Sequence, residues 1–129
     1  MASQKPQNRP QGSLLVVEDD RELAHVLSDV LSMSGYDVVL KATAGDAMDY
    51  LNERGSVVAA ILDVEVPDGD SFCVADRLRS ADIPYVFASG SCSPLPREHH
   101  WAPYFSKPYP IAEVIDAIEM CRSSGVPKP

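Results

Sequence analysis

Two kinds of hydrophobic pattern alternate along the chain. Short runs that are apolar throughout are followed by longer stretches in which apolar residues recur every three or four positions. The first pattern is typical of strands buried on both faces, and the second is typical of amphipathic helices. The runs expected to form strands are Ser13–Val17, Tyr36–Ala42, Val57–Leu62, Ile83–Ala88 and Pro103–Ser106.

Helices are expected between these strands. After the first strand, Leu23, Leu27 and Leu31 lie on one helical face, and Gly35 ends the helix. Asp20 and Thr43 precede the first two helices, where a side-chain oxygen can accept hydrogen bonds from the first N–H groups. The other apolar helical faces fall within residues 44–51, 72–78 and 111–118.

The alternation of strand and helix predicts an α/β fold, a doubly wound five-stranded parallel sheet with helices on both faces. The segment between Ser89 and Lys107 departs from this pattern. It contains Pro94 and Pro96 and has no clean apolar face, so only about residues 97–102 could be helical. We therefore expect the fourth helix to be short or irregular. The expected domain spans residues 13–122, between tails at 1–12 and 123–129.

Composition and charge narrow the class of protein. With 129 residues, 45% of them apolar, the chain suits one globular domain. Its formal net charge of -8 argues against binding nucleic acid or an anionic membrane. The longest apolar run, Val57–Leu62, is far short of the roughly 20 residues of a membrane span, and the N-terminus has no secretory signal pattern. The three cysteines are well separated, which favours a reduced, cytoplasmic protein.

Carboxylates follow two of the expected strands directly. Glu18 and Asp19 come after the first strand, and Asp63 comes after the third. If those strands are neighbours, the three side chains meet at one edge of the sheet, where ligands of parallel α/β folds bind. Carboxylates about 5 Å apart repel by roughly 3 kcal/mol at an effective dielectric near 20, so the group calls for a cation. Hard oxygen ligands with room for water suit Mg²⁺.

Two further strand ends carry groups that can hold a phosphoryl oxygen. The fourth strand is followed by Ser89 and Gly90, which offer a hydroxyl and a backbone N–H. The fifth is followed by Lys107 and Pro108, which place an ammonium group at the same edge. A nucleophilic carboxylate together with a divalent cation, a hydroxyl and a lysine indicates phosphoryl transfer.

Four motifs in this order resemble the response-regulator receiver domain of two-component systems, the CheY-like family. The matching stretches are LLVVEDD at 14–20, LDVEVPDG at 62–69, PYVFASG at 84–90 and SKPY at 106–109. The resemblance covers about residues 13–122 and implies the strand order 2-1-3-4-5. The FASG stretch is also loosely similar to stand-alone receivers whose fourth strand ends in F-A-T-G.

The resemblance also implies a role for each matching residue. Asp63 would be the phosphoacceptor, Asp19 would bind Mg²⁺ directly, and Glu18 would bind it through water. The backbone carbonyl of Glu65 would complete the metal ligands. The remaining implied roles are contact with the phosphoryl group for Ser89 and Lys107, an aromatic switch position for Tyr104, and a cis peptide bond before Pro108.

The function implied is that of a Mg²⁺-dependent phosphoacceptor that works as a monomer. A histidine kinase or phosphotransfer protein would phosphorylate it, and it would signal by contact with a downstream protein or serve as a phosphate shuttle or sink. It would catalyse only its own phosphorylation and dephosphorylation. The sequence shows no output domain, and the altered fourth segment argues against the dimer that many receivers form.

Other interpretations of these residues remain open. A degenerate receiver would bind partners without phosphorylation, although the complete set of site residues disfavours it. A haloacid-dehalogenase-type phosphatase would require D-x-D-x-T, whereas residues 63–67 read DVEVP. A flavodoxin-like cofactor site would need a phosphate-cradling loop that the sequence lacks. His99 and His100 are expected to lie in an inert loop, and Cys73 is expected to pack as a small core residue.

Overall fold

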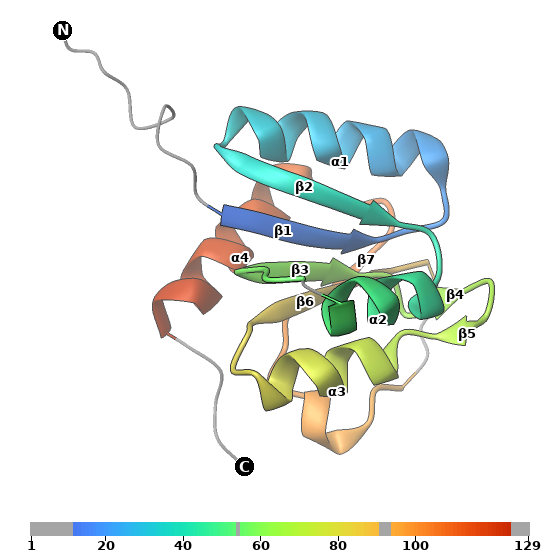
Figure 1. Ribbon diagram of the computed structural model, residues 1–129. Helices are drawn as coiled ribbons and strands as arrows, with labels where there is room; N and C mark the ends of the chain where they lie inside the picture. Colours follow the sequence, from blue (N-terminus) through green and yellow to red (C-terminus); the bar gives the residue numbers. More distant parts are fainter. Residues whose placement is uncertain (1–11, 54, 91–93, 125–129) are drawn as a thin grey trace, which may run out of the picture.

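A parallel sheet forms the centre of the protein. The computed structural model describes residues 12–53, 55–90 and 94–124. Five parallel strands are ordered β2-β1-β3-β6-β7, which confirms the predicted fold class and strand order (Figure 1). The strands of this sheet are β1 (Gly12–Val17), β2 (Tyr36–Lys41), β3 (Ala59–Leu62), β6 (Tyr85–Ser89) and β7 (Tyr104–Ser106).

The register of the central strands places their carboxyl ends side by side. Val17, the last residue of β1, is the partner of Leu62, the last residue of β3. The backbone N–H of Asp63 continues this pairing and donates to the Val17 carbonyl at 2.9 Å. At the other side of β3, the N–H of Lys107 donates to the Ser89 carbonyl at 2.9 Å, so β6 and β7 also end together. The polar residues that follow these four strands therefore start from one edge.

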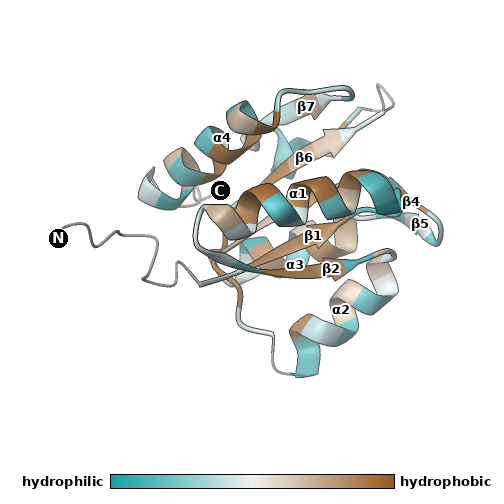
Figure 2. Ribbon diagram, turned by 90° about the horizontal axis from the view of Figure 1, so that it is seen from above, coloured by the Kyte–Doolittle hydropathy of each residue, from teal (hydrophilic) through white to brown (hydrophobic). Residues whose placement is uncertain are grey.

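Two helices cover each face of the sheet. The helices are α1 (Arg21–Met33), α2 (Ala44–Glu53), α3 (Phe72–Ser80) and α4 (Ile111–Ser124). Buried side chains of α1 and α4 share one apolar cluster with β1, β3 and β6, and those of α2 and α3 share a second cluster on the opposite face. Figure 2 shows the same division, with apolar strands inside and hydrophilic residues along the outer sides of the helices.

The first two helices start at the residues expected to cap them. The Asp20 carboxylate accepts hydrogen bonds from the N–H groups of Glu22 and Leu23, at 3.1 and 3.2 Å. The Thr43 hydroxyl accepts from the N–H of Asp46 at 3.1 Å. Gly35 follows α1 with a φ of 98°, a left-handed conformation that glycine adopts without steric cost. Local sequence thus sets both ends of α1.

Two features lie beyond the regular alternation of strand and helix. Residues after Asp63 form a small antiparallel hairpin, β4 (Glu65–Val66) and β5 (Gly69–Asp70), which the sequence did not suggest. Between β6 and β7, the described residues 94–103 contain only a 3₁₀-helix at Arg97–His99. The expectation of a short or irregular fourth helix is confirmed for this part of the segment, while residues 91–93 lie outside the described ranges.

Three expectations about individual positions need correction or limitation. Cys73 is exposed, because the buried face of α3 consists of Val74, Ala75 and Leu78. The expected C-terminal tail began at residue 123, but α4 continues to Ser124, and residues 125–129 lie outside the described chain. The expected N-terminal tail also falls outside it up to residue 11, and residue 12 already belongs to β1.

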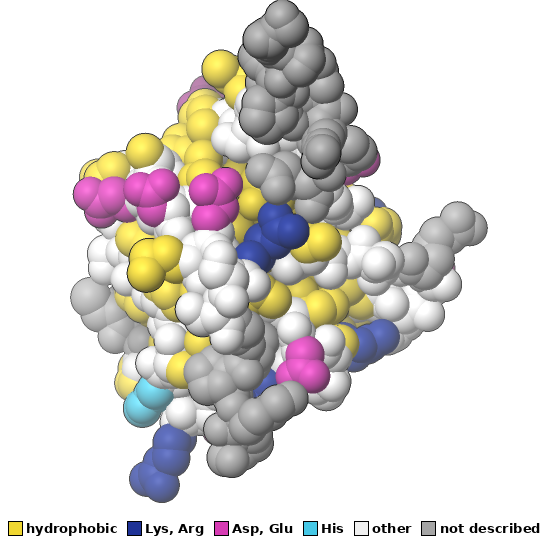
Figure 3. All heavy atoms as spheres, turned by 90° about the vertical axis from the view of Figure 1, so that its left-hand side faces the viewer, with side chains coloured by type: hydrophobic (Ala, Val, Ile, Leu, Met, Phe, Trp, Pro, Cys, Tyr) yellow, Lys and Arg dark blue, Asp and Glu magenta, His cyan; other side chains and the backbone are white. Residues whose placement is uncertain are grey.

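Among the described residues no helix is both long and apolar enough to cross a membrane. Figure 3 views the edge at which the strands begin. On that face, the Lys and Arg side chains of the described residues lie singly among apolar and acidic side chains and form no continuous basic patch with one another.

Candidate functional site

Three carboxylates gather at the carboxyl edge of the sheet, as the sequence predicted. Glu18 and Asp19 leave the end of β1, and Asp63 leaves the end of the neighbouring β3. One oxygen from each lies within 4.8 Å of one oxygen from each of the others. Glu18 and Asp63 are each only 5% exposed, whereas Asp19 faces solvent. The group therefore combines two buried anions with one that is accessible.

Lys107 balances the two buried carboxylates. Its Nζ lies 2.8 Å from Glu18 Oε1 and 3.0 Å from Asp63 Oδ2, so one ammonium group bridges the ends of two strands. The peptide bond between Lys107 and Pro108 is cis, as the family resemblance implied. Glu18 is also held from the other side, because its Oε2 accepts a hydrogen bond from the Asp20 N–H at 3.0 Å.

Burial and neighbouring groups both shift the pKa values of Glu18 and Lys107. Burial raises the pKa of Glu18, and the nearby charge of Asp63 adds to the rise, although the hydrogen bonds from Lys107 and Asp20 oppose it. Burial alone would lower the pKa of Lys107, but its hydrogen bonds to Glu18 and Asp63 reverse this and hold the pKa above its ordinary value. Lys107 therefore stays protonated at neutral pH, and further positive charge would stabilise the three close carboxylates.

Lys107→Met should lower the free energy of unfolding by about 2 kcal/mol at pH 7 in the absence of divalent cations. Breaking a fully buried ion pair costs about 3–5 kcal/mol, and partial exposure of Lys107 reduces that figure. The loss should shrink near pH 4.5, because Glu18, whose pKa is raised, takes up a proton and no longer repels Asp63. Urea unfolding at both pH values measures the effect. An equal loss at both would contradict this electrostatic explanation.

The other predicted site residues occupy the same edge of the sheet or lie near it. Ser89 ends β6 and is 1% exposed. Tyr104 begins β7, is half-buried and packs against the apolar cluster beneath α2 and α3. Glu65 is exposed and opens the β4–β5 hairpin directly after Val64. The role of Ser89 toward a phosphoryl group, that of Tyr104 as a switch and that of Glu65 as a metal ligand stay predictions.

Two residues near the site carried no specific sequence signal. Asp68, in the turn of the hairpin, binds the first N–H groups of α2 across a long stretch of chain. Tyr109 follows the Lys-Pro pair, and its buried hydroxyl has no hydrogen-bond partner within the described part of the chain. Burial, followed by the negative charge of Glu18, raises the pKa of Tyr109 to about 12. Only the S-K-P-Y motif pointed to this tyrosine, and it gave no role.

The expectation that His99 lies in an inert loop is wrong. Its ring is fully buried, and Nε2 lies 2.8 Å from Asp76 Oδ1, while Nδ1 contacts the Tyr85 hydroxyl. A carboxylate accepts from an imidazole N–H, so Nε2 donates to Asp76, which leaves Nδ1 to accept from the Tyr85 hydroxyl whenever the ring carries one proton. Burial raises the pKa of Tyr85 to about 12, so its hydroxyl keeps the proton that it donates. His100 is exposed, as expected.

These contacts give His99 a structural role. Oxygens of Asp76 and Glu98 lie close enough to the ring for the three to hold a metal ion. However, both nitrogens of the histidine already have partners, and the two carboxylates are exposed. The ring instead joins the 3₁₀-helix to α3 and β6, because Asp76 belongs to α3 and Tyr85 to β6.

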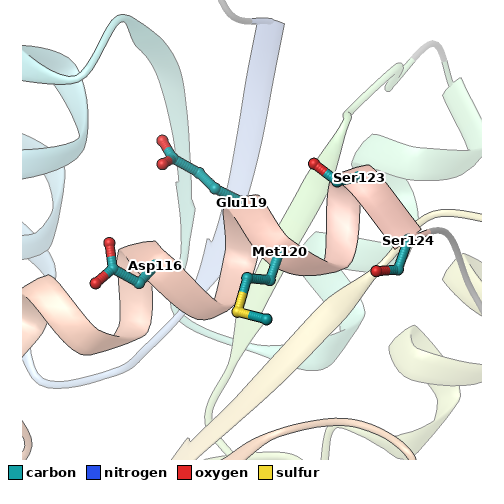
Figure 4. A pocket seen from close by; sticks show the side chains of 5 residues that line it. All are labelled: Asp116, Glu119, Met120, Ser123 and Ser124. Carbon is teal, nitrogen blue, oxygen red and sulfur yellow. The ribbon is translucent and has the colours of Figure 1, made fainter.

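A hollow of about 520 Å³ lies on the surface of α4, away from the carboxylates. Its lining side chains are Asp116, Glu119, Met120, Ser123 and Ser124 (Figure 4). All of them come from one helix, near the edge at which the strands begin (Figure 1). The site described above lies at the opposite edge, so this hollow takes no part in it.

Comparison with solved structures supports the fold. The structure resembles that of the non-phosphorylated HemR receiver domain from Leptospira biflexa with a TM-score of 0.74 and 25% sequence identity, covering 94% of this chain and 98% of that one. It also resembles a CheY-like response regulator receiver domain from Methylobacillus flagellatus with a TM-score of 0.69 and 25% identity, covering 85% and 97% of the two chains.

Among curated proteins, the chain is similar to regulators longer than itself. It is 33% identical over 131 residues to the virulence transcriptional regulatory protein PhoP of Salmonella choleraesuis, which matches 88% of this chain and 54% of PhoP. It is 29% identical over 110 residues to the transcriptional regulatory protein CpxR of Escherichia coli, which matches 81% of this chain and 47% of CpxR. The chain thus spans about half the length of these two relatives. No family model matches it.

Proposed function

We propose that this chain, which is a receiver domain of the response-regulator family, accepts a phosphoryl group on Asp63 from a histidine kinase or a phosphotransfer protein. The observation that supports this most directly is the position of Lys107. Its ammonium group joins Glu18 to Asp63 at the carboxyl edge of the sheet, beside the accessible carboxylate of Asp19. A nucleophile, a cation and a group of metal-binding oxygens thus lie within one small volume.

The nucleophile in this proposal is a carboxylate oxygen of Asp63. The oxygen attacks the phosphorus of a phosphohistidine, the P–N bond breaks, and its electron pair returns to the imidazole, which takes a proton from solvent. The product on the receiver is an acyl phosphate. The ion pair with Lys107 uses Oδ2, and the other oxygen, Oδ1, takes no part in that pair. Lys107 can then follow the charge from the carboxylate to the new phosphoryl oxygens, and the Ser89 hydroxyl can donate to another.

The residues present fit a bound Mg²⁺. Asp19, Asp63 and the backbone carbonyl of Glu65 would hold the ion, and Glu18 would hold it through water. Hard carboxylate oxygens close together, one of them open to solvent, match its preference for oxygen ligands and retained water. When bound, Mg²⁺ supplies positive charge that offsets the negative charge on the transferring phosphoryl group.

The proposed output is protein contact or onward transfer of the phosphoryl group by a cytoplasmic monomer. The fourth helix, which many receivers use to pair, is replaced over the described residues 94–103 by one 3₁₀-turn fixed by His99. This supports a monomer that signals through another surface, with Tyr104 as the proposed aromatic switch beside Ser89. Tyr104 is the strand partner of Phe87, which lies two residues before Ser89 in β6. A movement of Ser89 could therefore reach Tyr104 through the paired strands.

The test is amide NMR with Mg²⁺, before and after addition of beryllofluoride, an acyl-phosphate mimic. We expect Mg²⁺ to shift the amides near Asp19 and Asp63. Beryllofluoride should then shift those near Ser89, Tyr104 and Lys107. A spectrum that responds to neither would contradict the proposal and would favour a degenerate receiver that binds partners without phosphate.

A further inference from the structure

Asp68 connects the hairpin after the acceptor aspartate to a helix on the same face of the sheet. Its Oδ1 accepts a hydrogen bond from the Ala44 N–H at 3.0 Å, and its Oδ2 accepts one from the Gly45 N–H at 2.9 Å. These are the first two N–H groups of α2, and they precede Asp68 by 24 and 23 positions. One carboxylate therefore binds two helix N–H groups with both of its oxygens.

This contact is not the only means of starting α2. The helix has its own cap, since the Thr43 hydroxyl accepts from the Asp46 N–H and the Thr43 carbonyl accepts from the Ala47 N–H at 3.2 Å. Gly45 is exposed, so water could satisfy its N–H in place of Asp68. The bonds therefore do more for the position of the hairpin than for the existence of the helix.

The chain is shaped to allow this approach. A Cβ added at Gly45 would lie 3.3 Å from Asp68 Oδ2, so the missing side chain leaves room for the carboxylate. Gly69 follows Asp68 with a φ of 129°, a conformation that side chains other than glycine rarely adopt. The positive end of the α2 dipole favours an anion at this point. The two N–H bonds, that of Gly45 foremost, accordingly lower the pKa of Asp68.

The hairpin that Asp68 holds also contains Glu65, at the start of β4. Glu65 pairs with Asp70, and Val66 pairs with Gly69, so the turn at Asp68 and the backbone of Glu65 belong to one short ladder. The helix that serves as the anchor is itself fixed, because its buried face packs into the same apolar cluster as Val17 and Leu62. By holding the turn against α2, Asp68 therefore also restrains the hairpin relative to the end of β3, which is followed by Asp63.

We propose that Asp68 is a positioning residue of the phosphoacceptor site. By tying the hairpin to α2, its carboxylate holds the backbone carbonyl of Glu65 where a divalent cation shared with Asp19 and Asp63 can bind it. The inference rests on the proposed function, since it concerns the metal ligand that the function assigns to Glu65. Asp68 itself touches neither the metal nor the phosphoryl group.

The test compares Asp68→Asn with Asp70→Asn. Both substitutions remove one negative charge from the same hairpin. The effect of losing that charge on cation binding is therefore common to both variants and drops out when they are compared. Within the described part of the chain, Asp70 accepts a local hydrogen bond, from the Phe72 N–H at 3.1 Å, which asparagine can also accept. Asparagine at 68 instead loses one acceptor and turns an NH₂ group toward an N–H. We expect Asp68→Asn to weaken Mg²⁺ binding about tenfold in an NMR titration, and Asp70→Asn to change it by less than about twofold.

The outcomes separate this inference from the proposed function. If the unchanged protein binds no Mg²⁺ and takes up no beryllofluoride, the proposed function fails. If it binds both and the two variants bind Mg²⁺ equally well, the function stands and the positioning role of Asp68 is wrong. A lower melting temperature for Asp68→Asn with unchanged Mg²⁺ affinity, measured well below that temperature, would also overturn the role, because a purely structural contact would produce that result.

Discussion

Asp63→Asn should abolish labelling of the chain by a phosphorylated histidine kinase or phosphotransfer protein. An amide oxygen is a much weaker nucleophile than a carboxylate oxygen. Glu18, which also pairs with Lys107, uses its second oxygen to accept from the Asp20 N–H, so we do not expect it to replace Asp63. Autoradiography after incubation with a phosphodonor measures the loss. Asp70→Asn provides the matched control, because it makes the same change of side chain in the adjoining hairpin and should keep its label.

The loss of labelling should not result from unfolding. Asparagine keeps the shape of the side chain, and its carbonyl oxygen can still accept from Lys107 at the position of Oδ2. Removing one of three close carboxylates relieves two pairwise repulsions of about 3 kcal/mol each at an effective dielectric near 20, and the lost charge attraction to Lys107, about 5 kcal/mol on the same scale, offsets most of this gain. We expect the free energy of unfolding to change by less than about 1.5 kcal/mol. Labelling of the variant at the full rate would refute the assignment of Asp63.

The carboxylate site could be predicted because it follows from the fold. Strands that are apolar on both faces indicate a parallel sheet, and the carboxyl ends of parallel strands lie at one edge of the sheet. Glu18, Asp63 and Lys107 directly follow such strands, so their meeting needed only the strand order, which the family resemblance implied and the structure confirms. Where a position depends on the backbone ladder, sequence is enough to place it.

Positions that depend on long-range side-chain contacts could not be placed in this way. Asp68 looks like a turn residue, and nothing near it in sequence indicates that the first N–H groups of α2 lie within its reach. Cys73 was misplaced because the buried stripe of α3 passes through Val74 and Ala75, one position further along. His99 was misread because it stands beside an exposed His100 in a segment with two prolines, a setting typical of solvent-exposed loops.

His99 anchors the segment that replaces the fourth helix. The ring stacks on Phe72 with 6.0 Å between centroids and meets Phe87 and Tyr85 edge-on at 5.9 and 5.6 Å. Of the residues described in this segment, His99 is the one with a fully buried polar side chain. A 3₁₀-turn of three residues has little stability of its own, so its position depends on this side chain.

His99→Ala should lower the free energy of unfolding by about 3 kcal/mol, because it leaves a ring-sized cavity among aromatic side chains and removes the partner of the Tyr85 hydroxyl. Thermal unfolding at pH 7 should show a fall in melting temperature of roughly 10 °C. Hydrogen exchange should rise at the amides of His99, His100 and Ala102, which donate to carbonyls within or next to this turn.

Two further variants separate the contributions of the ring. His100→Ala is the matched control, since the His100 ring is exposed and, among the described residues, hydrogen-bonds the Leu95 carbonyl. This variant should change the free energy of unfolding by less than about 0.5 kcal/mol. His99→Phe keeps the volume of the ring but loses both polar contacts, so it should cost about 2 kcal/mol. If the alanine variants at 99 and 100 melt at the same temperature, the segment is held by other contacts, such as that of Arg79 with the Glu98 carbonyl. If His99→Phe is as stable as the unchanged protein, apolar packing alone holds the segment in place.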